Sequence, residues 1–213
     1  MRGMGDPVDE IDEQMRVREG WSDAAVLADL IALEPLPDED VFYSDSALSS
    51  AAWARANLFV ALSGVCATRK LRPAAKLLLE RASEGDPGEM MRGLRHALEG
   101  IFTPDWEDLA RVCIECMSSQ RAGTRMWAAD ELGTLREPMG LPALLAALDD
   151  PQIYNPARAT VLGNVGMAIA MLCRAHPGLA PEAVAALRVR ASRDQDGSFM
   201  EETAREIAAA LEP

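Results

Sequence analysis

Lysine, histidine and aromatic residues are scarce in this 213-residue sequence. It contains two lysines, two histidines and 5% aromatic residues, whereas hydrophobic residues reach 49%. The apolar residues are mostly Ala and Leu, which favour helices packed closely on helices over β-sheets. Around His96 no Ser, Cys or Asp stands at a spacing that indicates a catalytic triad. The composition therefore predicts an all-α protein and gives no sign of an enzyme.

A long apolar run is also missing. The best candidate, 161–173, is interrupted by Gly163, Asn164 and Gly166 and is shorter than the roughly 20 apolar residues that span a bilayer. The first residues turn acidic and lack the apolar core of a signal peptide. We expect a cytoplasmic protein without a membrane span.

The four cysteines are too few and too scattered for a disulfide framework. They lie in apolar helical stretches, which is typical of reduced core residues. Cys113 and Cys116 have the spacing of a metal knuckle, and Cys173 with His176 could complete a Cys₃His zinc site. Cys113 and Cys116 lie in the middle of one predicted helix, whereas Cys173 and His176 end another, and this favours core packing instead. The sequence has no glycine-rich phosphate loop, and we predict no metal and no cofactor.

Positive charge is in deficit, and the deficit is concentrated at one end. The net charge is −13, of which residues 1–45 carry −10 through thirteen acids and three arginines, which leaves −3 for residues 46–213. Such a segment repels nucleic acid, because nucleic-acid binding depends on Lys and Arg neutralising phosphates. It attracts a protein with a basic surface. The alternative is that the acidic segment serves solubility alone.

Apolar residues recur at helical spacing between short turns. Residues 1–21 form an acidic segment that can be disordered, and residues 22–213 form a single helical domain. We predict five helix pairs: 22–33 with 47–66, 73–83 with 89–101, 105–117 with 123–136, 141–148 with 156–173, and 181–193 with 200–211. No stretch alternates with the period of a β-strand.

One connection between predicted helices is unusually long. The loop 34–45 is rich in acids and carries two aromatic residues. Long loops in compact domains are often functional. We take as candidate partner-binding residues the acids and aromatics of this loop together with one Trp on the next helix: Asp38, Glu39, Asp40, Phe42, Tyr43 and Trp53.

A short pattern repeats along the second helices of the pairs. A glycine stands one or two positions after an apolar residue at Gly64, Gly100, Gly133 and Gly166, with spacings of 36, 33 and 33 residues. Arginines stand eight positions before the last three glycines, at Arg92, Arg125 and Arg158. Repeats of this length indicate stacked supersecondary units. Glycines would let neighbouring backbones approach, and each Arg would reach an acidic turn, at Asp86 or at Asp149 and Asp150.

The run 125–151 reads Arg-Met-Trp-Ala-Ala-Asp-Glu-Leu-Gly, a proline-marked turn, then Leu-Pro-Ala-Leu-Leu-Ala-Ala-Leu-Asp-Asp-Pro. It resembles HEAT repeats, and more narrowly the bacterial HEAT-like repeats also found in phycobilin lyases. The likeness is strong over 125–166, moderate over 73–124 and weak elsewhere. It implies a right-handed α-α superhelix, a HEAT-like solenoid of about five helix pairs. The near absence of lysine beside nineteen arginines is typical of a GC-rich bacterial genome.

HEAT-like proteins mostly bind other proteins along the face lined by their inner helices. The sequence therefore predicts a non-enzymatic protein-binding scaffold whose partner has a basic surface. One alternative is an immunity or inhibitor protein that neutralises a basic toxin or nuclease. Another is a HEAT-like enzyme with bilin lyase-like or DNA glycosylase-like activity, although a glycosylase needs a basic concave stripe. Arg69, Lys70, Arg72 and Lys76 form a basic cluster that is typical of a solvated helix face.

Overall fold

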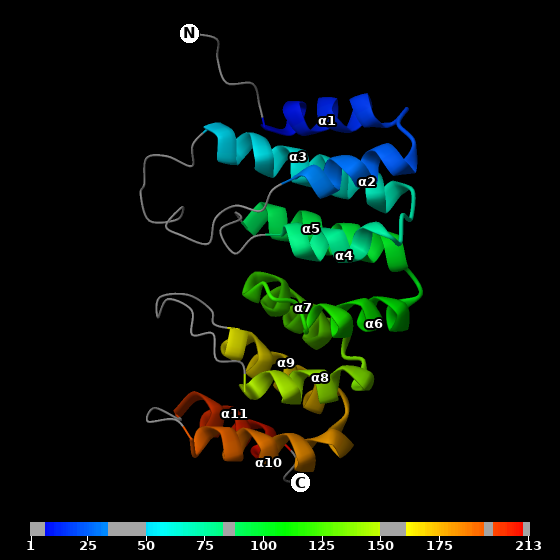
Figure 1. Ribbon diagram of the computed structural model, residues 1–213. Helices are drawn as coiled ribbons and strands as arrows, with labels where there is room; N and C mark the ends of the chain where they lie inside the picture. Colours follow the sequence, from blue (N-terminus) through cyan, green and yellow to red (C-terminus); the bar gives the residue numbers. More distant parts are fainter. Residues whose placement is uncertain (1–6, 34–49, 83–87, 150–160, 194–197, 211–213) are drawn as a thin grey trace. The chain divides into compact units, whose positions relative to one another are not determined.

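The structure, a computed structural model, describes residues 7–33, 50–82, 88–149, 161–193 and 198–210 (Figure 1). Every regular element in these ranges is a helix, which confirms the predicted all-α class. Within them, no helix is long and apolar enough to cross a bilayer. The chain divides into two compact units, 1–105 and 106–213. The division at residue 105 is not the boundary that the sequence predicted, which separates an acidic segment 1–21 from a helical domain 22–213. The predicted boundary stays a prediction.

The described residues of the first unit form five helices in two layers. Helices α1, α3 and α5 pack side by side in one layer, and α2 and α4 pack against each other in the second. Their bounds are α1 (Pro7–Arg18), α2 (Asp23–Ala32), α3 (Ser50–Thr68), α4 (Ala74–Arg81) and α5 (Gly88–Phe102). Ser22 caps α2, as its place at the predicted helix start implies, because its hydroxyl accepts a hydrogen bond from the amide of Ala25 at 3.2 Å.

The second unit has a similar two-layer arrangement, with six α-helices in its described ranges. Helices α7, α9 and α11 form one layer, and α6, α8 and α10 cover them. Their bounds are α6 (Trp106–Cys116), α7 (Ala122–Leu135), α8 (Leu141–Ala146), α9 (Val161–Ala175), α10 (Ala180–Ala191) and α11 (Ser198–Ala209), with 3₁₀ turns at Pro138–Gly140, Ala147–Asp149 and Pro177–Leu179. Each of the ten predicted helices coincides with an observed helix, and the described ends agree to within about two residues. The right-handed superhelical path stays a prediction.

Helix α1 was not predicted, since the segment 1–21 is dominated by acids and its apolar residues are few. Two long side chains attach it to its neighbours. Met15 lies against Gly64 of α3, and the guanidinium of Arg18 binds the carboxylate of Asp29 on α2 at 3.0 Å. Arg18 also lies over the ring of Trp21, at 4.9 Å from the centroid. Contacts distant in sequence therefore order this helix.

Within the layers α1–α3–α5 and α7–α9–α11, which contain the second helix of each predicted pair and are here called the inner layers, the contacts of α3 with α5 and of α9 with α11 share one register. In the first unit, Gly93 faces Val60 and Gly100 faces Ala67, so that α5 contacts α3 at positions 33 residues apart along its length. In the second unit, Gly166 of α9 faces Phe199 of α11, again 33 residues apart. At these three contacts the separation equals the 33-residue spacing of the glycine pattern, whereas Gly133 of α7 faces Ala168 of α9, 35 residues away.

The glycines lie at the helix–helix contacts, as the sequence analysis expected, but on two different sides. A fully buried residue precedes each glycine: Leu62, Leu98, Leu132 and Val165. Gly64 and Gly100 come two positions after it and face the preceding inner helix, whereas Gly133 and Gly166 come one position after it and face the following one. Each residue turns the chain by about 100° around the helix axis. A glycine one position after the buried residue therefore lies on one side of that residue, and a glycine two positions after it lies on the other side.

Candidate functional site

The side chains of the predicted partner-binding residues lie outside the described part of the structure. Asp38, Glu39, Asp40, Phe42 and Tyr43 are outside the described residues, and Trp53 lies on α3 with a side chain that is not described. Their role in partner binding stays a prediction.

The predicted arginine ladder can be followed at Arg125 alone. Arg92 lies on α5 with an undescribed side chain, and Arg158 is outside the described residues. Arg125 is 9% exposed and donates to the backbone carbonyl of Ser119 in the turn before α7, at 2.7 Å. Asp149, a predicted ladder acid, pairs with Arg193 at 2.7 Å, and whether it also meets Arg158 stays a prediction. Arg125 thus reaches the preceding turn, but this contact is with a backbone carbonyl.

The basic cluster after α3 is engaged inside the first unit. The guanidinium of Arg69 donates to four acceptors: the backbone carbonyls of Trp21, Arg18 and Glu19 at 2.8, 3.0 and 2.9 Å, and the carboxylate of Asp23 at 3.0 Å. Arg72 forms an ion pair with Asp105, and the Lys70 ammonium donates to the carbonyl of Thr103. These groups connect the ends of neighbouring helices within the first unit.

The four cysteines are buried and free. Burial raises the pKa of the Cys66 and Cys173 thiols to about 11, and it raises the pKa of the Cys113 thiol well above its usual range, with the nearby carboxylate of Glu131 adding to the effect. Thiols of this kind are poor nucleophiles and poor metal ligands at neutral pH. Among the described residues no three His, Cys, Asp or Glu side chains gather as a metal site. Their burial confirms the predicted place of the four cysteines in the core.

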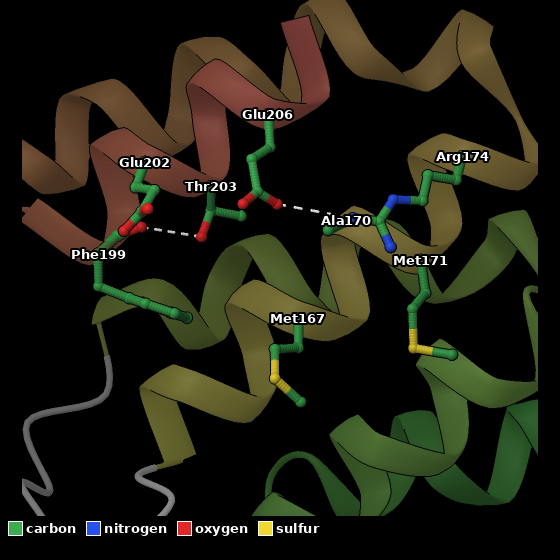
Figure 2. Close-up of a pocket in the computed structure, with 8 residues that line it drawn as sticks. All are labelled: Met167, Ala170, Met171, Arg174, Phe199, Glu202, Thr203 and Glu206. Carbon is green, nitrogen blue, oxygen red and sulfur yellow. Dashed lines mark hydrogen bonds and ion pairs between the residues drawn. The ribbon is translucent and has the colours of Figure 1, made fainter. Parts of the chain in front are cut away.

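A groove between α9 and α11 is the strongest candidate site (Figure 2). Its volume is about 440 Å³. The lining consists of four residues from each helix: Met167, Ala170, Met171 and Arg174 from α9, and Phe199, Glu202, Thr203 and Glu206 from α11. Met167 is 51% exposed and Phe199 is 43% exposed, so the groove offers apolar surface directly to solvent. Apolar surface that is accessible in this way is typical of a binding site.

The helices position these side chains by their register. On each helix the lining residues follow the spacing i, i+3, i+4, i+7, which places them on one stripe. This stripe is distinct from the fully buried Val165, Ile169 and Leu172 of α9, which belong to the core. Gly166 lets α11 approach, since a β carbon there would lie 3.0 Å from the ring of Phe199. The absence of a side chain at Gly166 therefore allows the two walls of the groove to lie close together.

Polar groups lie among the apolar ones. Arg174 and Glu206 form an ion pair across the groove at 3.5 Å, which Figure 2 shows as a dashed line. The hydroxyl of Thr203 donates to the carbonyl of Phe199 at 2.8 Å, so it is satisfied within α11. Glu202 is exposed and has no ion-pair partner among the described residues. The lining therefore combines apolar contact with one carboxylate that is available to a ligand.

The sequence analysis missed this groove. A signal was present, because Met167, Met171 and Arg174 lie 32 residues before Phe199, Thr203 and Glu206, and both groups share the helical spacing. Periodicity alone could not separate an exposed stripe of methionines from a core stripe, since both are apolar.

No family model, no curated protein and no solved structure matches the chain.

Proposed function

We propose that the chain is a HEAT-like repeat protein that binds another protein and catalyses no reaction. In this proposal residues 22–213 form a right-handed solenoid of about five helix pairs, and the groove between α9 and α11 belongs to the binding surface. The parallel inner helices, in contact at the 33-residue spacing of the repeat, support the HEAT-like assignment.

The observation that carries the binding function is the exposure of Met167 and Phe199 beside each other on neighbouring helices. Burying the exposed half of a side chain of this size would stabilise a complex by roughly 1 kcal/mol through the hydrophobic effect. A partner surface that covers Met167 and Phe199 would provide this burial. Methionine suits such a surface, because its flexible, polarisable side chain adapts to different partners.

Charge supports a basic partner. The net charge of −13 would steer a cationic protein toward the chain, and the acidic loop with Asp38, Glu39 and Asp40 would add local attraction. Under this proposal Phe42, Tyr43 and Trp53 supply apolar contacts. Raising the salt concentration would then weaken the complex, mainly by slowing association.

Affinity capture with matched variants tests the proposal. The wild-type chain, Met167→Glu and Val189→Glu serve as baits in an extract of the cell from which the chain comes. Val189 lies on α10 outside the groove and is 53% exposed, so its variant adds the same charge at an equally exposed apolar position. We expect a protein that Val189→Glu retains and Met167→Glu loses.

The baits are compared at low and high salt, and circular dichroism confirms that both variants fold. Equal recovery of the same proteins by all three baits would exclude the groove as a binding surface. A capture that no salt concentration affects would remove the acidic region from the proposal.

A further inference from the structure

The length of the groove limits the length of the ligand segment that can bind in it. Each wall is a stripe of eight helix positions, from Met167 to Arg174 and from Phe199 to Glu206. At 1.5 Å per residue this is about 10 Å, or two helical turns. The two stripes run side by side, as the Gly166–Phe199 contact and the Arg174–Glu206 pair at their two ends show. The result is a short channel bounded by two parallel helices.

The walls favour a helical ligand over an extended one. Backbone N–H and C=O groups inside α9 and α11 are used within those helices, so the walls offer no edge to which an extended peptide could add. An extended segment would also cover Met167, Met171 and Phe199 with unpaired peptide groups, which is costly. A helix satisfies its own backbone and presents side chains to the channel, as neighbouring helices do in any helical layer.

Charge determines which helix fits. The Arg174 guanidinium is already paired with Glu206, and the carboxylate of Glu202 lies between the two ends of the groove without an ion-pair partner in the described part of the chain. A partner carboxylate placed there would be repelled, and a partner ammonium or guanidinium would be attracted.

We infer that the groove accepts an amphipathic helix of the partner protein. Its apolar residues, spaced by three and four, lie over Met167, Met171 and Phe199, and a Lys or Arg beside them reaches Glu202. This inference rests on the proposed function and deepens it, because it states the kind of segment that the partner contributes.

Two synthetic helical peptides test the inference on the full chain. One is an 18-residue peptide with Leu at positions spaced by three and four and Lys elsewhere, and the other is the same peptide with Glu in place of Lys. Methyl resonances of ¹³C-labelled methionine report binding at Met167 and Met171 and are assigned by Met→Leu substitutions. We expect the Leu/Lys peptide to shift both resonances to saturation, and the Leu/Glu peptide to bind about tenfold more weakly or less.

Glu202→Gln separates a specific contact from the attraction of the whole acidic chain. We expect this variant to lower the affinity for the Leu/Lys peptide about two- to fivefold, as for an exposed ion pair. Glu182→Gln, an equal loss of charge on α10 outside the groove, should leave it unchanged. Equal effects of the two substitutions, or equal binding of the two peptides, would overturn the role of Glu202.

The outcomes for the two proposals can be told apart. If neither peptide shifts Met167 and Met171 while partner capture still depends on Met167, the helical-ligand inference is wrong and the proposed function stands. If capture is independent of Met167, the groove is excluded from the proposed function, and any peptide shift then reflects a surface that the captured proteins do not use.

Discussion

Gly133 of α7 lies so close to Ala168 of α9 that a β carbon on residue 133 would stand 2.8 Å from the Ala168 Cα. The neighbour is backbone, so relief would require α9 to move as a whole. The groove wall belongs to the same helix, which means that the spacing set at Gly133 also determines where Met167 and Met171 lie. Gly133 is a poor helix former, but the close approach of α7 and α9 requires a residue without a β carbon at this position.

We expect Gly133→Ala to destabilise the second unit by about 1–2 kcal/mol, because overpacking against backbone exceeds the roughly 1 kcal/mol gained in helix propensity. Gly64→Ala should cost less, since its clash is with the terminal methyl of Met15, which can rotate away. Gly178→Ala serves as the control, because nothing lies within 4 Å of its added carbon. Urea unfolding of the three variants measures the order, and a Gly133→Ala variant as stable as wild type would contradict the close contact.

Arg69→Ala should destabilise the first unit by roughly 1–3 kcal/mol, because it removes charge-assisted bonds to three carbonyls around the end of α1 and to the carboxylate of Asp23. The loss should appear first as faster amide hydrogen exchange in α1. Arg111→Ala is the matched control, since Arg111 pairs with Glu107 and Asp108 on the exposed surface of one helix and contributes less than about 0.5 kcal/mol. Similar effects of the two substitutions would show that Arg69 adds no more than a surface ion pair.

The stability of the fold should fall as the pH rises from about 9 to about 11. Burial raises the pKa of Cys66 and Cys173 from 9.0 to about 11, so the folded state keeps its thiols protonated where the unfolded chain would already release protons. The stabilisation is therefore complete below pH 9 and is lost as the pH approaches 11. Denaturant unfolding between pH 8.5 and 10.5 measures the slope.

The double variant Cys66→Ala/Cys173→Ala is the control for this slope, because it removes both groups while other residues titrate as before. Its stability should depend less steeply on pH than that of the wild-type chain. Parallel curves would show that the two thiols do not titrate differently on unfolding.

Arg174→Gln should leave stability within about 0.5 kcal/mol of wild type, because the Arg174–Glu206 pair is largely exposed. It should also free the Glu206 carboxylate and raise the affinity of the groove for the Leu/Lys peptide about two- to fivefold. Arg205→Gln, which removes an equal charge from α11 outside the lining, should change the affinity less. Weaker binding by Arg174→Gln would mean that Arg174 itself contacts the ligand.

Helix positions could be predicted from the sequence because local signals specify them. Ser22 begins α2 and caps it, and Pro181 stands in the first turn of α10. The glycine pattern also predicted correctly where inner helices touch, since a residue without a side chain at a fixed spacing has few other uses in a helix. Helix α1 was missed because its apolar stripe is short and its order depends on Met15 and Arg18 meeting partners far along the chain.

By itself the sequence determined the helical class, the approximate positions of α2 to α11 and the spacing of the glycines, because capping, periodicity and glycine placement act within a few residues. The tertiary structure alone decided which flank each glycine occupies and which apolar stripe stays exposed. A shift of one residue between Gly100 and Gly133 turns the contact to the other neighbour, and Met167 differs from a core methionine only in having nothing packed over it. Both properties depend on which helix lies next to which, and that is set by packing between residues distant in the chain.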